Sequence, residues 1–66
     1  MKKDGKEYEN RGRDYFFTRA DGRMYWRTIW RCIEDKKEYV KWSGNFIEVV
    51  RGRHGYVTVG DYGDYV

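Results

Sequence analysis

The sequence predicts an all-β fold, and two observations lead to this expectation. Aromatic residues make up 20% of the 66 residues, so a few large rings can bury enough area to stabilise a short chain. Runs rich in aromatic and β-branched residues alternate with short turns that contain glycine, which is the pattern of antiparallel strands. Together they predict a five-stranded antiparallel meander.

Each strand is placed by the turn that ends it. Asp21-Gly22 and Ser43-Gly44 are strong hairpin signals, because glycine adopts the positive φ that tight turns need. We therefore expect turns at Ala20–Gly22 and Ser43–Asn45, and strands over 15–19, 23–33, 38–42, 46–51 and 56–59. Five strands this short cannot bury a flat face well, so the meander should close toward a small SH3-like barrel.

The second of these runs also fits a helix. At helical spacing Tyr25, Ile29 and Trp30 fall on one side of the segment, while Arg23, Arg27 and Arg31 fall on the other. Its many aromatic residues and the preceding Asp-Gly turn favour a strand instead. The alternative to the all-β fold is therefore an α+β fold, with one helix at about 23–35 packed on a sheet.

The residues expected in the core alternate with polar neighbours or lie in the middle of their runs. They are Phe17, Trp26, Trp30, Val40, Trp42, Ile47, Val49, Val57 and Val59. Cys32 lies in the apolar run 23–33 with no second cysteine to pair with, so we expect a buried, unreactive thiol.

The first residues differ in composition from the rest of the chain. Residues 1–14 contain only Met1 and Tyr8 among lysine, arginine, aspartate, glutamate, asparagine and glycine. This composition is typical of a flexible charged tail. We therefore expect a mobile segment over 1–14, followed by a single small β domain over 15–66.

A short stretch resembles a known family. The sequence Glu38-Tyr39-Val40-Lys41-Trp42-Ser43-Gly44 resembles a strand and turn of chromodomains, over about a tenth of the chain. The resemblance implies a small SH3-like or chromo-like barrel, and Trp42 falls on a position that the family uses in its methyl-lysine cage. A likeness of fold does not by itself imply that activity.

The sequence contains no catalytic constellation. The single histidine, His54, lies in a glycine-bounded turn, and no base is placed next to Cys32. Structural zinc requires four ligands, and the chain offers one cysteine and one histidine. We therefore expect a non-enzymatic protein without a metal site or a cofactor.

Positive charge gathers in the first half of the chain. Six arginines lie within residues 11–31, against two acids, although the net charge of the whole chain is only +3. Arginines interleaved with an aromatic ring are suited to contact phosphates while the ring stacks on a base. The residues predicted to form this binding surface are Arg11, Arg13, Arg23, Tyr25, Arg27 and Arg31.

Two partner classes follow from this composition. We name nucleic acid first, bound through its phosphate backbone; the second is an acidic protein surface, which a small phage- or mobile-element-type inhibitor or adaptor of a host protein would bind. No apolar run is long enough to span a membrane or to act as a signal peptide, and a lone cysteine suits a reducing compartment. We therefore expect a cytoplasmic protein without membrane partners, and exposed strand edges are compatible with a homodimer.

Overall fold

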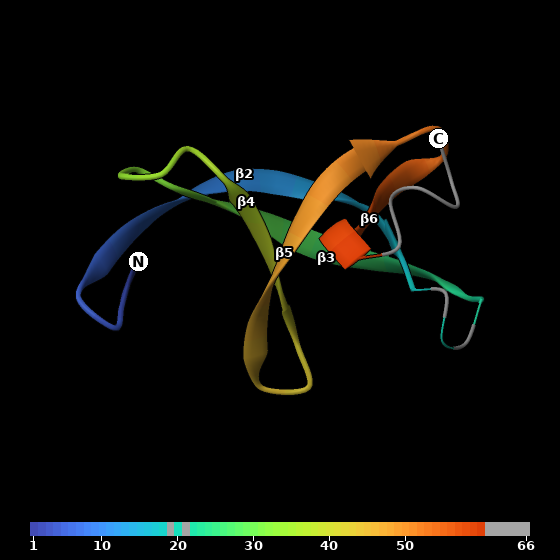
Figure 1. Cartoon of the computed structure of the whole chain (residues 1–66), viewed down its shortest axis with the longest axis horizontal. Helices are drawn as coiled ribbons and strands as arrows, with labels where there is room; N and C mark the ends of the chain where they lie inside the picture. The colour runs from blue at the N-terminus through green and yellow to red at the C-terminus, as the bar shows by residue number, and fades with distance from the viewer. Residues whose placement is uncertain (19, 21, 61–66) are drawn as a thin grey trace.

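The computed structural model describes residues 1–18, 20 and 22–60. These residues form a closed five-stranded β-barrel with one additional strand and no α-helix, so the predicted small SH3-like all-β barrel is confirmed (Figure 1). The strands are β1 (Lys2–Lys3), β2 (Lys6–Phe17), β3 (Met24–Cys32), β4 (Glu38–Trp42), β5 (Asn45–Gly52) and β6 (Gly55–Thr58).

The strands follow one another around the barrel in sequence order, and each pair of neighbours is antiparallel. Closure comes from a short parallel pairing of β2 with β6, in which Phe16 lies opposite Tyr56 and Phe17 opposite Val57. Figure 1 shows β2 and β3 as long curved strands that β4 and β5 cross, with β6 at the far end from the β1–β2 hairpin.

Residues 1–14 do not form the separate tail that their composition predicts. Lys2–Lys3 and the first half of β2 form a hairpin, in which Asp4 and Gly5 occupy the turn with φ of 53° and 80°. Positive φ at both turn residues belongs to the type I′ turn, which matches the twist of the flanking strands. The Asp-Gly signal therefore outweighs the polar composition of the segment.

The segment that also fitted a helix is a strand. β3 pairs with β2 over its whole length and with β4 at Ile29, Trp30 and Arg31. The α+β alternative with a helix at about 23–35 is therefore wrong. The cross-strand partners that β2 supplies along most of the segment, and β4 at three positions, outweigh the helical spacing of its apolar residues.

A β-bulge in the middle of β2 changes which residues of the strand face the barrel interior. Arg11 and Gly12 together lie opposite Ile29, because Asn10 pairs with Trp30 while Arg13 pairs with Thr28. Gly12 has a φ of +86°, and its N–H donates to Asn10 Oδ1. One extra residue reverses the alternation of side chains along the strand.

The barrel interior, here called the inner face, is built around Phe16, Ile29, Val40, Val49 and Tyr56. Tyr25, Trp42 and Ile47 pack against this cluster and are partly exposed.

The predicted core is therefore correct in part. Val40, Val49 and Val57 are buried, as expected, whereas Trp26 and Val59 are about half exposed, so their placement in the core is wrong. Phe17 and Trp30 are only partly buried, while Phe16 and Ile29 are almost fully buried. The prediction selected the wrong face of two strands, since adjacent residues point to opposite sides.

Of the two predicted turns, the one at Ser43–Gly44 is fully described by the structure. Ser43 and Gly44 have φ of 50° and 80° and connect Trp42 to Asn45, which pair with each other. Near the other turn, the Gly22 N–H donates to the Thr18 carbonyl at 3.0 Å. Asp21 of the Ala20–Gly22 turn, Arg19 and the acidic C-terminal residues 61–66 lie outside the described residues. Within the described part of the chain, no helix is long and apolar enough to cross a membrane.

Candidate functional site

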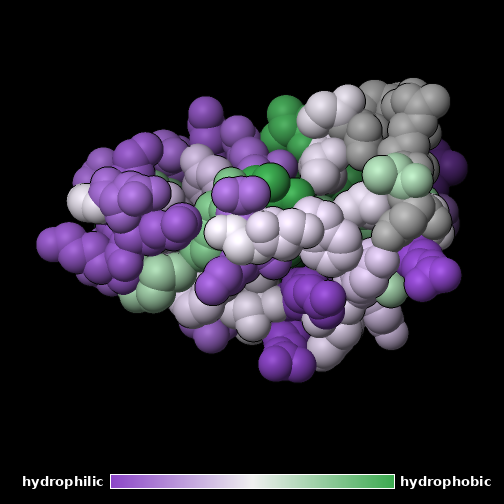
Figure 2. Space-filling view, turned by 90° about the horizontal axis from the view of Figure 1, so that it is seen from below, coloured by the Kyte–Doolittle hydropathy of each residue, from purple (hydrophilic) through white to green (hydrophobic). Residues whose placement is uncertain are grey.

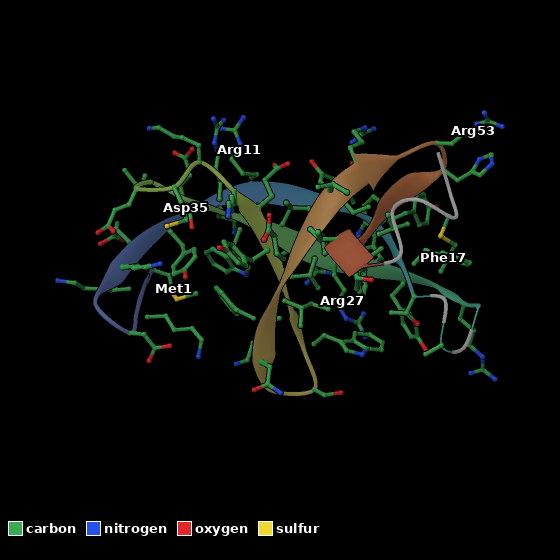
Figure 3. All side chains as sticks on the ribbon, in the orientation of Figure 1. Met1, Arg11, Phe17, Arg27, Asp35 and Arg53 are labelled. Carbon is green, nitrogen blue, oxygen red and sulfur yellow. The ribbon has the colours of Figure 1, made fainter. Side chains whose placement is uncertain are left out.

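The six residues predicted to bind a partner do not form one surface. Figure 3 shows Arg11 and Arg27 projecting to opposite sides of the long β2–β3 ribbon. Arg23 is exposed just before β3, and Arg13 is exposed on the outer face, the side of the sheet opposite the barrel interior. Tyr25 faces inward and packs against the core.

Arg31 lies between two acids that are distant from it in the sequence. It is directly opposite Glu9 on β2 and directly opposite Glu38 on β4. Side chains in such positions are about 5 Å apart at their Cβ atoms, and opposite charges there attract. Arg31 therefore has an acidic residue directly opposite it on each of the two flanking strands.

Arg27 is likewise occupied by contacts within the protein. Its guanidinium lies 5.1 Å from the centre of the Tyr25 ring and 5.6 Å from that of Trp42, and its Nη1 donates to the Trp26 carbonyl at 3.0 Å. Arg27 also pairs across the strands with Asp14. The Arg27 guanidinium is therefore engaged by two rings and a backbone carbonyl of the protein itself.

Asp14 is committed to another arginine. Arg51 Nη1 donates to Asp14 Oδ2 at 2.7 Å, and this bond is the main reason why the pKa of Asp14 lies below its usual value. On β2, Arg11 lies 3.5 Å from the Glu9 carboxylate. Of the predicted arginines, Arg13 is thus the one that is exposed on the outer face without an acid directly opposite it.

The structure brings together a different basic and aromatic site, which the sequence analysis missed. A groove of about 340 Å³ runs between the β1–β2 hairpin, β3 and the β4–β5 turn. We call it the lysine–aromatic groove; the described residues that line it are Met1, Lys2, Lys3, Trp30, Lys41, Gly44 and Phe46.

Two rings form the apolar part of the groove. Trp30 and Phe46 are nearly parallel, with 23° between their planes and 6.4 Å between their centres. Both are partly exposed, so each presents some ring surface to a ligand. A flat pair of partly exposed rings is the type of surface on which a base or another ring can stack.

Lysines surround these rings. Lys3 Nζ lies 5.4 Å from the centre of the Phe46 ring, and Lys2 and Lys41 line the same groove. Lys3 is also 3.9 Å from the Asp4 carboxylate, but that acid is exposed, so the pair is weak. No acidic residue is among the described residues that line the groove. In Figure 2 the hydrophilic side chains gather at the left end, where Figure 1 places the β1–β2 hairpin.

One of the groove rings, Phe46, also packs against two tyrosines. Tyr8, Tyr39 and Phe46 contact one another edge-to-face or stacked, with ring centres between 5.0 and 6.3 Å apart. Burial, together with the hydrogen bond from its hydroxyl to Asp35 Oδ2 at 2.9 Å, raises the pKa of Tyr39 to about 12. The Lys37 N–H that donates to Asp35 holds the pKa of that carboxyl below its usual value.

A second, smaller pocket is apolar. It has a volume of about 210 Å³, and its described lining consists of Phe17, Met24, His54 and Val57. Among the described residues no three histidine, cysteine or carboxylate side chains form a group that could hold a metal ion. Comparisons with models of protein families, with curated proteins and with solved structures found no match to this chain.

Proposed function

We propose that this protein is a small non-enzymatic binding protein that contacts the phosphate backbone of a nucleic acid through the lysine–aromatic groove. The observation that carries the proposal is the combination of Lys2, Lys3 and Lys41 with the partly exposed rings of Trp30 and Phe46. Lysine ammonium groups attract phosphates, and the release of counterions that follows supplies most of the non-specific binding energy.

The ligand class is the one that the sequence favours, but the proposed binding site is the lysine–aromatic groove and not the arginine surface predicted from the sequence. Arg27 and Arg31 lie among acids and aromatic rings of the protein itself. Lys2 and Lys41 are exposed at the groove, and Lys3 lies over the partly exposed Phe46 ring that lines it. Arg13 stays part of the surface, because it is exposed on the same outer face of the sheet as Trp30.

The test is a titration of labelled oligonucleotides at two salt concentrations. We compare the wild type with a groove variant, in which Lys2, Lys3 and Lys41 become glutamine. The matched control changes Lys36, Lys37 and Arg53 to glutamine; these exposed residues lie in other turns and remove the same charge.

We expect the groove variant to lose most binding and to reduce the slope of log K against log salt by about 0.7–0.9 for each lost phosphate contact. The control variant should retain the wild-type slope of log K against log salt, because its groove lysines are unchanged. A third variant, with Arg23, Arg27 and Arg31 changed to glutamine, tests the surface predicted from the sequence. If only that variant loses binding, the groove is not the site.

The alternative function, a small inhibitor or adaptor that binds a host protein, is favoured by Tyr15 and Trp26, which are both about half exposed. Exposed aromatic residues are frequent hot spots of protein interfaces. Absence of nucleic-acid binding at low salt would favour this alternative, and Tyr15→Ala and Trp26→Ala should then abolish capture of a partner that survives nuclease treatment.

A further inference from the structure

A second aromatic platform lies on the outer face of the sheet. Tyr15 on β2 and Trp26 on β3 are directly opposite each other, with ring centres 4.9 Å apart and 68° between their planes. They are 51% and 48% exposed, which is unusual for two large rings in a chain with so few apolar residues to bury. Their contact holds each ring in place without covering it.

This platform shares a face with the groove. Trp26, Thr28 and Trp30 alternate along β3, and alternate residues of a strand point to the same side. The two tryptophans are four positions apart on the strand, so the platforms are about 13 Å apart along β3.

The stretch between the platforms is basic. Arg13 lies directly opposite Thr28, so its exposed side chain stands midway between Trp26 and Trp30. The acids nearest in the sheet, Glu9, Asp14 and Glu38, occupy positions of the inner face or pair with arginines there. The ring of Trp26, the cation of Arg13 and the ring of Trp30 therefore follow one another on the outer face of the β2–β3 pair.

We infer that the ligand is a single-stranded nucleic acid that runs along the outer face of β3, from the lysine–aromatic groove past Arg13 to the Tyr15–Trp26 platform. This inference rests on the proposed function and specifies its ligand. The bases of a single strand are free to stack on protein rings, whereas those of a duplex are stacked inside the helix. Two platforms with a cation between them match a chain that alternates bases with phosphates.

The experiment measures binding of oligothymidylates of two, four, eight and twelve nucleotides, and of a twelve-base-pair duplex, at low and at moderate salt. We expect affinity to rise with length until the strand reaches both platforms, and the single strand of twelve nucleotides to bind more tightly than the duplex. Equal affinity for the duplex and the single strand would overturn the inference and leave the proposed function intact. Absence of binding to every oligonucleotide at low salt would overturn both.

Variants test the second platform itself. Trp26→Ala should weaken binding of the twelve-nucleotide strand by about 5- to 150-fold, as the loss of one stacked base does, and should leave the dinucleotide unaffected. Trp26→Phe keeps a ring and should keep most of the affinity. Ile33→Ala is the control, because Ile33 is an exposed apolar residue that follows the end of β3 and lines neither the groove nor the Tyr15–Trp26 platform. If Trp26→Ala binds the long strand as the wild type does, the strand does not reach this platform; if the variant fails to fold, the length and duplex comparisons decide.

Discussion

Burial of Tyr39, together with its hydrogen bond to Asp35, makes the protein sensitive to alkaline pH. The pKa of Tyr39 in the folded state is about 12, against about 10 in an unfolded chain, so the unfolded chain loses this proton first as the pH rises. The stabilisation is complete below about pH 10 and is lost between about pH 10 and 12. We expect Tyr39→Phe to cost about 1 kcal/mol at neutral pH and to make the alkaline loss of stability shallower.

The measurement is the free energy of unfolding in urea at several pH values from neutral to alkaline. Tyr8 and Tyr56 also have raised pKa values through burial, so part of the alkaline loss should remain in the variant. Tyr15→Phe serves as the control, because it removes the hydroxyl of an exposed tyrosine. A Tyr39→Phe profile that parallels the wild type would contradict the prediction.

Cys32 is buried with no exposed surface, as the sequence predicted, and its thiol should react only when the structure opens. A domain of this size is stable by roughly 3–5 kcal/mol, so labelling of the native thiol should be at least about 100-fold slower than labelling of the unfolded chain. Thiol-reagent kinetics measure this ratio. Glu34→Cys adds an exposed thiol that should label rapidly in the same sample. If Cys32 in the native protein reacts equally fast, the prediction is wrong.

The arginines show what a count of charges along the chain omits. The sequence correctly indicates that Arg27 and Arg31 share a face of a strand, but it does not indicate which strands flank them. Pairing places Arg31 between Glu9 and Glu38, two residues outside the segment over which the charge was counted. Local charge density predicts a binding surface only where the neighbouring strands contribute no acids.

At the scale of elements, the pairs of a polar residue and glycine are the best predictors of where strands turn. Ser43-Gly44 forms the expected turn, and the same signal at Asp4-Gly5 forms β1 and brings Lys2 and Lys3 to the groove. The composition of residues 1–14 as a whole predicts a tail, whereas a hairpin needs only a two-residue turn and two strands that pair. The missed site follows from this missed turn.

The bulge at Gly12 is an element that alternation in the sequence could not reveal. It allows Tyr8 to pack against Tyr39 and Phe46 on the outer face while Phe16 faces the barrel interior, although both are even-numbered residues of one strand. We expect deletion of Gly12 to force one of the two rings to the wrong face, at a cost of about 3–5 kcal/mol that would unfold a domain this small.

Gly12→Ala is the matched comparison for that deletion. No atom lies within 4 Å of a Cβ built on Gly12, so only the positive φ opposes the change and the cost should be about 1–2 kcal/mol. Urea unfolding curves of the two variants give the comparison. A deletion variant as stable as Gly12→Ala would show that β2 tolerates continuous alternation.

The molecule as a whole depends on closure of the sheet. The meander was predicted from the sequence because consecutive strands connected by short turns pair with their neighbours. The parallel pairing of β2 with β6 was not, since nothing in either strand marks the other as its partner. The same closure decides which residues are inside: Phe16 and Tyr56 meet across it, and the predicted core chose Phe17 instead.

Gly55 allows β6 to approach β2 closely enough for the two strands to pair. A Cβ at this position would lie 3.0 Å from the Tyr15 carbonyl oxygen and 3.1 Å from the Tyr15 Cβ, and the residue has a φ of +135°. In Gly55→Ala, β6 must therefore move away from β2, or the backbone of both must distort. We expect a loss of about 1–3 kcal/mol for the overpacking, and more from the strained φ.

The loss should be local before it is global, because only two residue pairs join β2 to β6. Hydrogen exchange of the backbone amides measures this: in Gly55→Ala, protection should fall first at the β2–β6 junction around Phe17 and Val57, while the β4–β5 hairpin keeps its protection relative to global unfolding. Gly60→Ala is the control, since no atom lies within 4 Å of its Cβ and its φ needs no glycine. Uniform loss of protection across all strands would mean that the barrel opens as a single unit, and that the short junction is no weaker than the meander it closes.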